Sequence, residues 1–146
     1  MKLYLDTSVY NRPFDDQTQP RIWLETLALA LILQLVEEGE ATLVNSSVLE
    51  FENMRNPVEM RSDWMARCLE QAETYQQVDL SIRVRAELLE KKGVKAMDAL
   101  HISSAEAAKA DYFLSCDDRL LKKHKALNIK AMNPVDFVQK VIGKHP

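Results

Sequence analysis

Residues 1–11 read MKLYLDTSVYN, and the order of residue types in this stretch decides the fold class. The apolar side chains up to Leu5 predict a buried strand over residues 2–5, and the strand then ends on a carboxylate, Asp6. An ionised carboxylate is costly to bury unless another group compensates its charge. Asp6 therefore either caps the turn that follows or faces a cation at the carboxyl edge of a sheet.

Strand and helix patterns alternate along the rest of the chain, after a polar loop at residues 11–19. Further strands are predicted at residues 41–45, 77–80, 112–115 and 129–132, and helices at residues 20–38, 47–55, 57–75, 81–92, 95–109, 118–125 and 135–142. Alternating strands and helices imply a parallel sheet with helices on both faces. We expect a three-layer α/β/α sandwich around a central, mainly parallel five-stranded sheet. Ligands of such folds bind beyond the carboxyl ends of the strands, where Asp6 lies.

Length and composition fit one globular domain over residues 1–146. The longest apolar run, residues 27–33, is far shorter than the roughly 20 residues of a membrane span. Cys68 and Cys116 fit neither a disulfide framework nor a metal knuckle, and no secretory leader is visible, so a cytoplasmic setting is expected. The net charge of −3 does not indicate a nucleic-acid binder, but basic residues cluster at 91–95 and 119–130 and would suit a phosphate backbone.

Three further acids occupy positions comparable to that of the first. Asp117 follows a strand pattern in DYFLSCDD (111–118), where Ser115 and Asp118 fit a helix cap that leaves Asp117 free. Asp98, in VKAMDALHISSA (94–105), and Glu50, which fits a capping box, lie near helix starts. In one parallel sheet these positions can converge on one edge, and converging carboxylates repel unless a divalent cation neutralises them. An all-oxygen ligand set suits Mg²⁺ or Mn²⁺ and phosphoryl chemistry.

Four blocks of the sequence resemble the signature blocks of PIN domains: LYLDTSVY (3–10), SSVLEFE (46–52), MDALHISSA (97–105) and FLSCDDRLL (113–121). The resemblance extends over essentially the whole chain, with the blocks in the family's order and spacing. It implies an endoribonuclease that uses one or two Mg²⁺ or Mn²⁺ ions to hydrolyse RNA. Many bacterial and archaeal members are VapC-like toxins that a cognate antitoxin neutralises.

The resemblance also assigns roles to individual residues by position. Ser115 matches a hydroxyl residue that would orient water or a carboxylate. The catalytic, metal-binding acids become Asp6, Glu50, Asp98 and Asp117.

Other side chains are alternatives or additions to this set. Glu52 competes with Glu50 for the acidic position on its helix, although Glu50 aligns better. The loop at residues 11–19 is longer than in many toxins, so Asp15 and Asp16 are further candidates for the site. His101 is interpreted as a packed core histidine. Contacts to the RNA backbone are expected from Arg12, Arg119 and Lys122.

Rival interpretations make different demands on the sequence. A haloacid-dehalogenase-like site needs an acid where Ser8 stands, and a receiver-like site needs a lysine where Met132 and Asn133 end the fifth strand. The remaining alternative is a PIN-like RNA-binding or protein-interaction module without nuclease activity. The helix over residues 22–36 has twelve apolar residues in fifteen, so we expect a homodimer through it or through the helix around Trp64.

Overall fold

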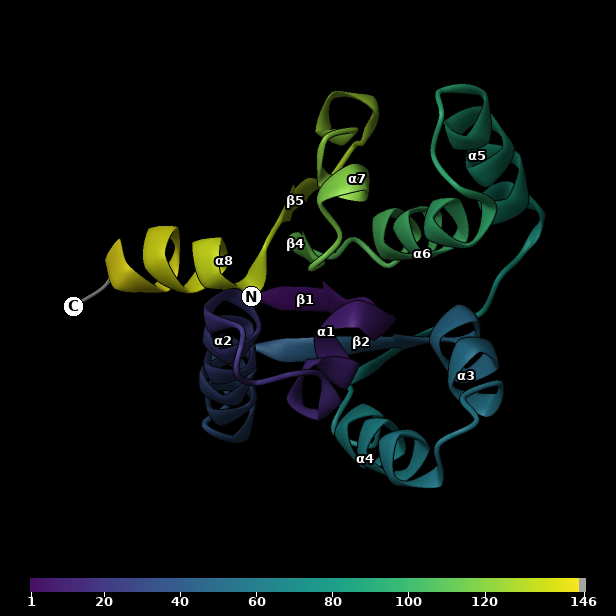
Figure 1. Cartoon of the computed structure of the whole chain (residues 1–146). Helices are drawn as coiled ribbons and strands as arrows, with labels where there is room; N and C mark the ends of the chain where they lie inside the picture. Colours follow the sequence, from purple (N-terminus) through teal and green to yellow (C-terminus); the bar gives the residue numbers. More distant parts are fainter. Residues whose placement is uncertain (145–146) are drawn as a thin grey trace.

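The computed structural model describes residues 1–144 and contains, within them, one sheet of five parallel strands (Figure 1). The strands are β1 (Lys2–Leu5), β2 (Thr42–Ser46), β3 (Thr74–Gln76), β4 (Tyr112–Leu114) and β5 (Lys130–Met132). They lie side by side in the order β3-β2-β1-β4-β5. The predicted parallel sheet is confirmed, with every strand parallel to its neighbours.

Helices cover both faces of this sheet, which confirms the α/β/α sandwich. They are α1 (Thr7–Asn11), α2 (Pro20–Glu37), α3 (Ser47–Met54), α4 (Glu59–Leu69), α5 (Leu80–Lys91), α6 (Ala96–Ala107), α7 (Asp118–Leu121) and α8 (Pro134–Lys140), with 3₁₀ turns η1 (Arg12–Phe14), η2 (His124–Ala126) and η3 (Ile142–Lys144). Figure 1 shows α2 and α4 below β1 and α5 and α6 above it. Crossovers between parallel strands are right-handed. Because the chain runs outward from β1 to β3 and then returns to β4, the two sets of helices lie on opposite faces.

The direction of the chain changes beside β1. From β1 the chain goes outward to β2 and β3, and it then returns to β4 on the other side of β1. Strands whose crossovers leave in opposite directions open a crevice at their carboxyl ends, and this crevice is the usual ligand site of such folds. Asp6 directly follows β1 and Asp117 lies three residues after β4, so both residues lie at this crevice.

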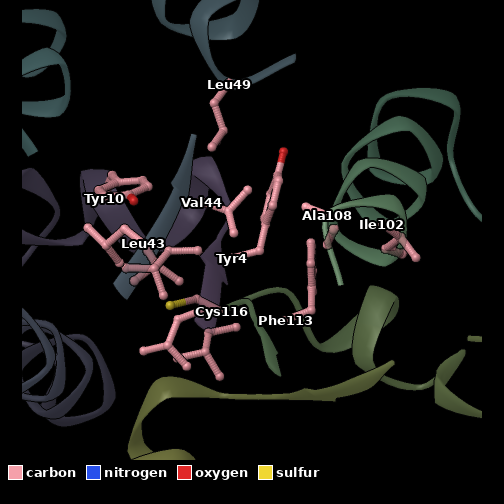
Figure 2. Packing of buried hydrophobic residues seen from close by; sticks show 14 of the residues in the cluster. Tyr4, Tyr10, Leu43, Val44, Leu49, Ile102, Ala108, Phe113 and Cys116 are labelled. Carbon is pink, nitrogen blue, oxygen red and sulfur yellow. The ribbon is translucent and has the colours of Figure 1, made fainter. Parts of the chain in front are cut away.

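The core is built around the central strand, and Tyr4 is its main aromatic residue. Tyr4 is fully buried, and its ring stacks on that of Phe113 of β4 with the ring centroids 5.4 Å apart. Figure 2 shows Tyr4 between Val44 and Phe113, with its hydroxyl oxygen directed toward the side of Leu49 at the start of α3. The residue thus packs as a core aromatic and still carries a polar atom toward the carboxyl end of the sheet.

Some local expectations were wrong. The strand predicted at residues 77–80 does not form, because β3 ends at Gln76 and Asp79 caps α5. Tyr75, expected on a helix together with Trp64, lies in β3 instead. A three-residue polar edge strand has no periodicity of its own, and pairing with β2 defines it. The helix predicted at residues 118–125 is divided into α7 and η2. No helix within residues 1–144 has the length and apolar content to cross a bilayer.

Candidate active site

Asp6 lies at the end of β1 with 5% of its surface exposed. Its carboxylate caps α1 by accepting from the backbone N–H of Val9 at 3.4 Å, and it also accepts from the hydroxyl of Ser8. Burial raises the pKa of Asp6, and hydrogen bonds from the hydroxyls of Ser115 and Ser8 partly oppose that rise. Asp6 is therefore a helix cap and, at the same time, a buried carboxylate that forms no salt bridge with a lysine or arginine among the described residues.

Asp117 caps α7, which corrects the prediction that Ser115 and Asp118 would form the cap and leave Asp117 free. Its carboxylate accepts from the backbone N–H of Arg119 at 2.9 Å, and its own N–H donates to the Ser115 hydroxyl at 3.0 Å. A capping carboxylate uses one oxygen in this way and keeps lone pairs for another ligand. The cap therefore fixes the position of Asp117 at the crevice and leaves the carboxylate able to bind a further ligand.

Asp98 lies in the first turn of α6 and is the acid most affected by its neighbours. Burial raises the pKa of Asp98, and the nearby carboxylates of Asp6 and Asp117 raise it further, to about 6. Like charges raise one another's pKa only when they are close. The structure thus brings together the carboxylates of β1, α6 and α7, three of the four acids that the sequence nominated.

Glu50 does not join this cluster. It is exposed, and one of its carboxylate oxygens accepts from the Tyr75 hydroxyl of β3 at 2.9 Å. The acid that reaches the cluster from α3 is Glu52, whose charge acts on Asp98 and which accepts from the Thr7 hydroxyl at 2.6 Å. Residues two apart point to nearly opposite sides of an α-helix. The geometry therefore favours Glu52 over Glu50 as the acid of α3 at the cluster, contrary to the sequence-based preference.

The sequence does contain a signal for this choice. The inward face of α3 is marked by the buried residues Val48 and Leu49, and Glu52 follows them by four and three positions. Glu50 belongs to the other side of the helix. The predicted capping box also fails, because α3 is capped by Ser46, whose hydroxyl accepts from the backbone N–H of Leu49 at 3.1 Å.

A pocket of about 370 Å³ is lined by two acids of the cluster, Asp98 and Asp117. Four basic residues line it as well: Lys95, Arg119, Lys122 and Lys123. Gly93, at φ +94°, also lines it, and the Lys123 ammonium lies 2.8 Å from where a Cβ of residue 93 would be. The basic side chains of this pocket suit the negative charge of a phosphodiester group, and the two acids suit a divalent cation beside it.

The remaining candidates from the first loop are engaged within the protein. Arg12 donates to the buried Glu25 at 2.9 Å and to Asp15 at 3.0 Å. Its guanidinium is therefore engaged within the protein, whereas the sequence had led us to expect it to contact RNA. Asp15 also accepts from Arg61 at 3.3 Å, and Asp16 accepts from the residues of its own turn. The longer loop therefore contributes ion pairs that hold the fold and adds no acid to the cluster.

The chemistry of the cluster fits a divalent metal ion. The donors are carboxylates. Burial raises the pKa of Asp6, and burial together with neighbouring carboxylates raises that of Asp98, so a hard cation bound between them would stabilise the ionised forms. Within residues 1–144 no three acidic, histidine or cysteine side chains lie close enough together to hold an ion as they stand.

Comparison with protein families agrees with this geometry: the PIN domain family model matches residues 3–126. The chain belongs to the PIN domain family. The match contains β1, α3, α6 and the segment after β4, and so every acid of the cluster. No curated protein matches the sequence at a significant level.

Solved structures of PIN-like fold resemble the chain over most of its length. A chain of VapBC2 from Rickettsia felis, solved with a DNA fragment from their promoter, has a TM-score of 0.59 at 16% identity and covers 91% of this chain and 98% of its own. FitAcB from Neisseria gonorrhoeae gives 0.53 at 18% identity, with 90% and 97% covered. VapBC-1 from nontypeable Haemophilus influenzae gives 0.55 at 13% identity, with 92% and 98% covered. At such identities the likeness establishes the fold.

Proposed function

We propose that this PIN domain is an Mg²⁺- or Mn²⁺-dependent endoribonuclease of the VapC-like toxin type. The observation that carries the proposal is the convergence of three carboxylates, two of which line a pocket together with four basic residues. The proposed metal ligands are Asp6, Asp98 and Asp117, with Glu52 in the place first given to Glu50. A divalent ion bound there supplies Lewis-acid stabilisation of charge on the reacting phosphate.

Side chains of the protein bind and orient the substrate. Arg119 and Lys122, which line the pocket, neutralise phosphate oxygens. The hydroxyls of Ser8 and Ser115 hold the Asp6 carboxylate in place. Attack by the 2′-hydroxyl of RNA needs a pair of facing acid–base groups, and within residues 1–144 the two histidines do not form one, because His101 is buried and the other is exposed on η2. The expected products therefore carry a 5′-phosphate and a 3′-hydroxyl.

The test is cleavage of a single-stranded RNA in the presence of Mn²⁺, with EDTA as the control. Asp98→Asn keeps the shape and removes one charge from the cluster, and it should lower the rate about 10²-fold or more. Asp118→Asn is the matched control, because Asp118 is exposed and pairs with Arg21 at 2.7 Å. Cleavage that survives EDTA, or full activity in Asp98→Asn, would refute the mechanism. Binding of RNA without any cleavage would favour the non-enzymatic PIN-like module.

A cognate antitoxin is the proposed protein partner. The support is that structural relatives were solved as VapBC assemblies. Expression of the chain should arrest growth, and co-expression with the product of a small reading frame beside its gene should relieve the arrest. Asp98→Asn should abolish the arrest without an antitoxin, which separates toxicity by cleavage from toxicity by misfolding.

Homodimerisation is proposed through α2. Its residues Trp23, Leu24, Leu27 and Leu31 are 43–51% exposed and form a stripe opposite the buried face of the helix. The helix around Trp64, the other candidate, is less suitable, because the Trp64 ring packs on Phe14 and its indole N–H donates to the backbone of Tyr10 at 2.8 Å. Light scattering should give about twice 16.8 kDa for the wild type and a monomer for Leu31→Glu.

A further inference from the structure

A chain of hydrogen bonds runs through the core from the start of α3 to the acidic cluster. The Ser46 hydroxyl lies 2.7 Å from the Tyr4 hydroxyl, which lies 2.6 Å from Nδ1 of His101. Nε2 of the same imidazole contacts Oε1 of Glu52. His101 is 2% exposed and Tyr4 is fully buried, so solvent does not supply alternative partners. His101 is thus a buried histidine, as expected, but both of its nitrogens are engaged.

The groups at the two ends of this hydrogen-bond network determine which of its atoms donate and which accept. At one end the Ser46 hydroxyl already accepts from the backbone N–H of Leu49 at 3.1 Å. At the other end Oε1 of Glu52 accepts from the Thr7 hydroxyl at 2.6 Å and faces Nε2 of His101. A carboxylate oxygen is an acceptor, so we place the proton of this contact on the imidazole nitrogen.

In one arrangement that satisfies these contacts, Nε2 of His101 donates to Glu52, Nδ1 accepts from the Tyr4 hydroxyl, and the Tyr4 hydroxyl accepts from Ser46. Burial raises the pKa of Tyr4 well above its usual value, so the phenol keeps the proton that it donates. The stack on Phe113 fixes the phenol ring and with it the direction of that hydroxyl.

The hydrogen bonds of the Glu52 carboxylate among the described residues all involve one of its two oxygens. Oε1 receives both the Thr7 hydroxyl and the His101 ring, whereas Oε2 has no hydrogen-bond partner among the described residues. Two donors on one oxygen fix the carboxylate about both of its last torsions. The unpaired oxygen is the one left to act on the cluster, where the charge of Glu52 already acts on Asp98.

We propose that His101 is a positioning residue: as the Nε2–H tautomer, aligned by Tyr4, it holds the Glu52 carboxylate so that Oε2 faces the metal-binding carboxylates. The proposal rests on the proposed function, and it gives the buried histidine a role beyond packing. A histidine that only filled space would need neither a fixed tautomer nor a partner on each nitrogen.

The tautomer can be tested without metal or substrate. In ¹⁵N–¹H spectra of the metal-free protein at neutral pH, His101 should show a protonated Nε2 and an unprotonated Nδ1. Tyr4→Phe removes the donor to Nδ1, and the Nδ1 resonance should shift toward that of a nitrogen without a hydrogen bond. An Nδ1–H tautomer, or a ring protonated on both nitrogens, would overturn the proposed alignment.

Positioning is tested by the affinity for Mn²⁺ in isothermal titration. His101→Leu should weaken binding about 10- to 100-fold, the usual effect of removing a hydrogen-bond partner of a metal ligand. His101→Gln keeps an N–H at the position of Nε2 and should recover most of the loss. In a Glu52→Gln background, His101→Leu should have little further effect, because both changes then act on the same carboxylate.

The outcomes separate this inference from the function on which it rests. If the wild type binds no Mn²⁺, the proposed function is refuted. The ¹⁵N–¹H spectra of the metal-free protein then still test the proposed tautomer of His101. If the wild type binds Mn²⁺ and His101→Leu binds it equally, positioning is refuted and the function stands. Should His101→Leu fail to fold, Tyr4→Phe decides in its place: it removes the hydrogen bond that aligns the imidazole and should weaken Mn²⁺ binding, and an affinity equal to that of the wild type overturns the proposal.

Discussion

Asp98→Asn is expected to make the metal-free protein more stable while it removes activity. In the folded chain the pKa of Asp98 is raised from 3.8 to about 6, chiefly by burial and then by the carboxylates of Asp6 and Asp117. A group whose folded pKa is raised binds its proton more tightly in the folded state. Stability is therefore lost as the pH rises from about 4 to about 6, and the whole loss is present at pH 7.5.

The magnitude follows from the size of the pKa shift. A shift of about two units corresponds to about 3 kcal/mol at 1.36 kcal/mol for each unit. Asp98 is partly exposed, and solvent screens part of the repulsion, so we expect about half of that value. For a chain of this length 1 kcal/mol moves the melting temperature by about 3 °C. Asp98→Asn should then melt roughly 3 to 6 °C higher than the wild type at pH 7.5.

The assay is thermal unfolding in EDTA at pH 7.5 and at pH 4.5, with Asp118→Asn as the control. The advantage of Asp98→Asn should shrink at pH 4.5, where Asp98 of the wild type is already protonated in the fold. Arg21 lowers the pKa of Asp118, so Asp118→Asn removes a favourable pair and should leave the melting temperature unchanged or lower it. The two substitutions are chemically the same and should act with opposite sign.

Addition of Mn²⁺ should reverse the order of stability. At a concentration 100 times Kd a ligand that binds only the folded state adds about 2.7 kcal/mol, and the wild type should gain more of this than Asp98→Asn. A melting temperature of Asp98→Asn below that of the wild type in EDTA at pH 7.5 would refute the argument from charge repulsion. An advantage that is equal at both pH values would refute it as well.

Four more substitutions test separate parts of the structure. Glu25→Gln should cost about 2 kcal/mol in urea unfolding at pH 7, because it removes the buried charge that pairs with Arg12 and Arg21 and leaves Arg12 with Asp15 alone. The pKa of Glu25 is lowered in the fold from 4.5, so the difference should be lost as the pH falls below 4.5 and through that lowered pKa. Lys122→Ala should weaken RNA binding and reduce the slope of log K against log salt by about 1. Glu52→Gln should lower nuclease activity about 10²-fold, whereas Glu50→Gln should leave it within about twofold; equal effects would contradict the assignment of Glu52 to the cluster.

The sequence by itself determined the architecture and most of the acids. The apolar run before Asp6 and the aromatic and aliphatic run before Asp117 are buried strands; Asp6 directly follows the first, and Asp117 lies three residues after the second. These signals are local: residues 2–5 are recognisable as a strand whatever the rest of the chain does. In a parallel sheet all strands end at one edge, so acids at strand ends converge as a consequence of topology.

Local patterns were weaker where pairing or packing defines an element. β3 exists because β2 offers an unpaired edge, and its three residues carry no periodicity that would place it before residue 77. Asp117 and Ser115 were both able to cap α7, and the choice between them depends on the direction in which the chain leaves β4. The sequence contains both caps, and the tertiary structure selects one.

The tertiary structure decided which acid of α3 faces the cluster, and it alone decided which polar groups support that acid. Glu50 and Glu52 are alike in type and neighbourhood, and the rotation of the helix on the core turns one outward and the other inward. Tyr4 and His101 are 97 positions apart, and only the fold of β1 against α6 brings their polar atoms to 2.6 Å. Sequence patterns report the period of an element, whereas its rotation and its distant partners are set by packing of the whole chain.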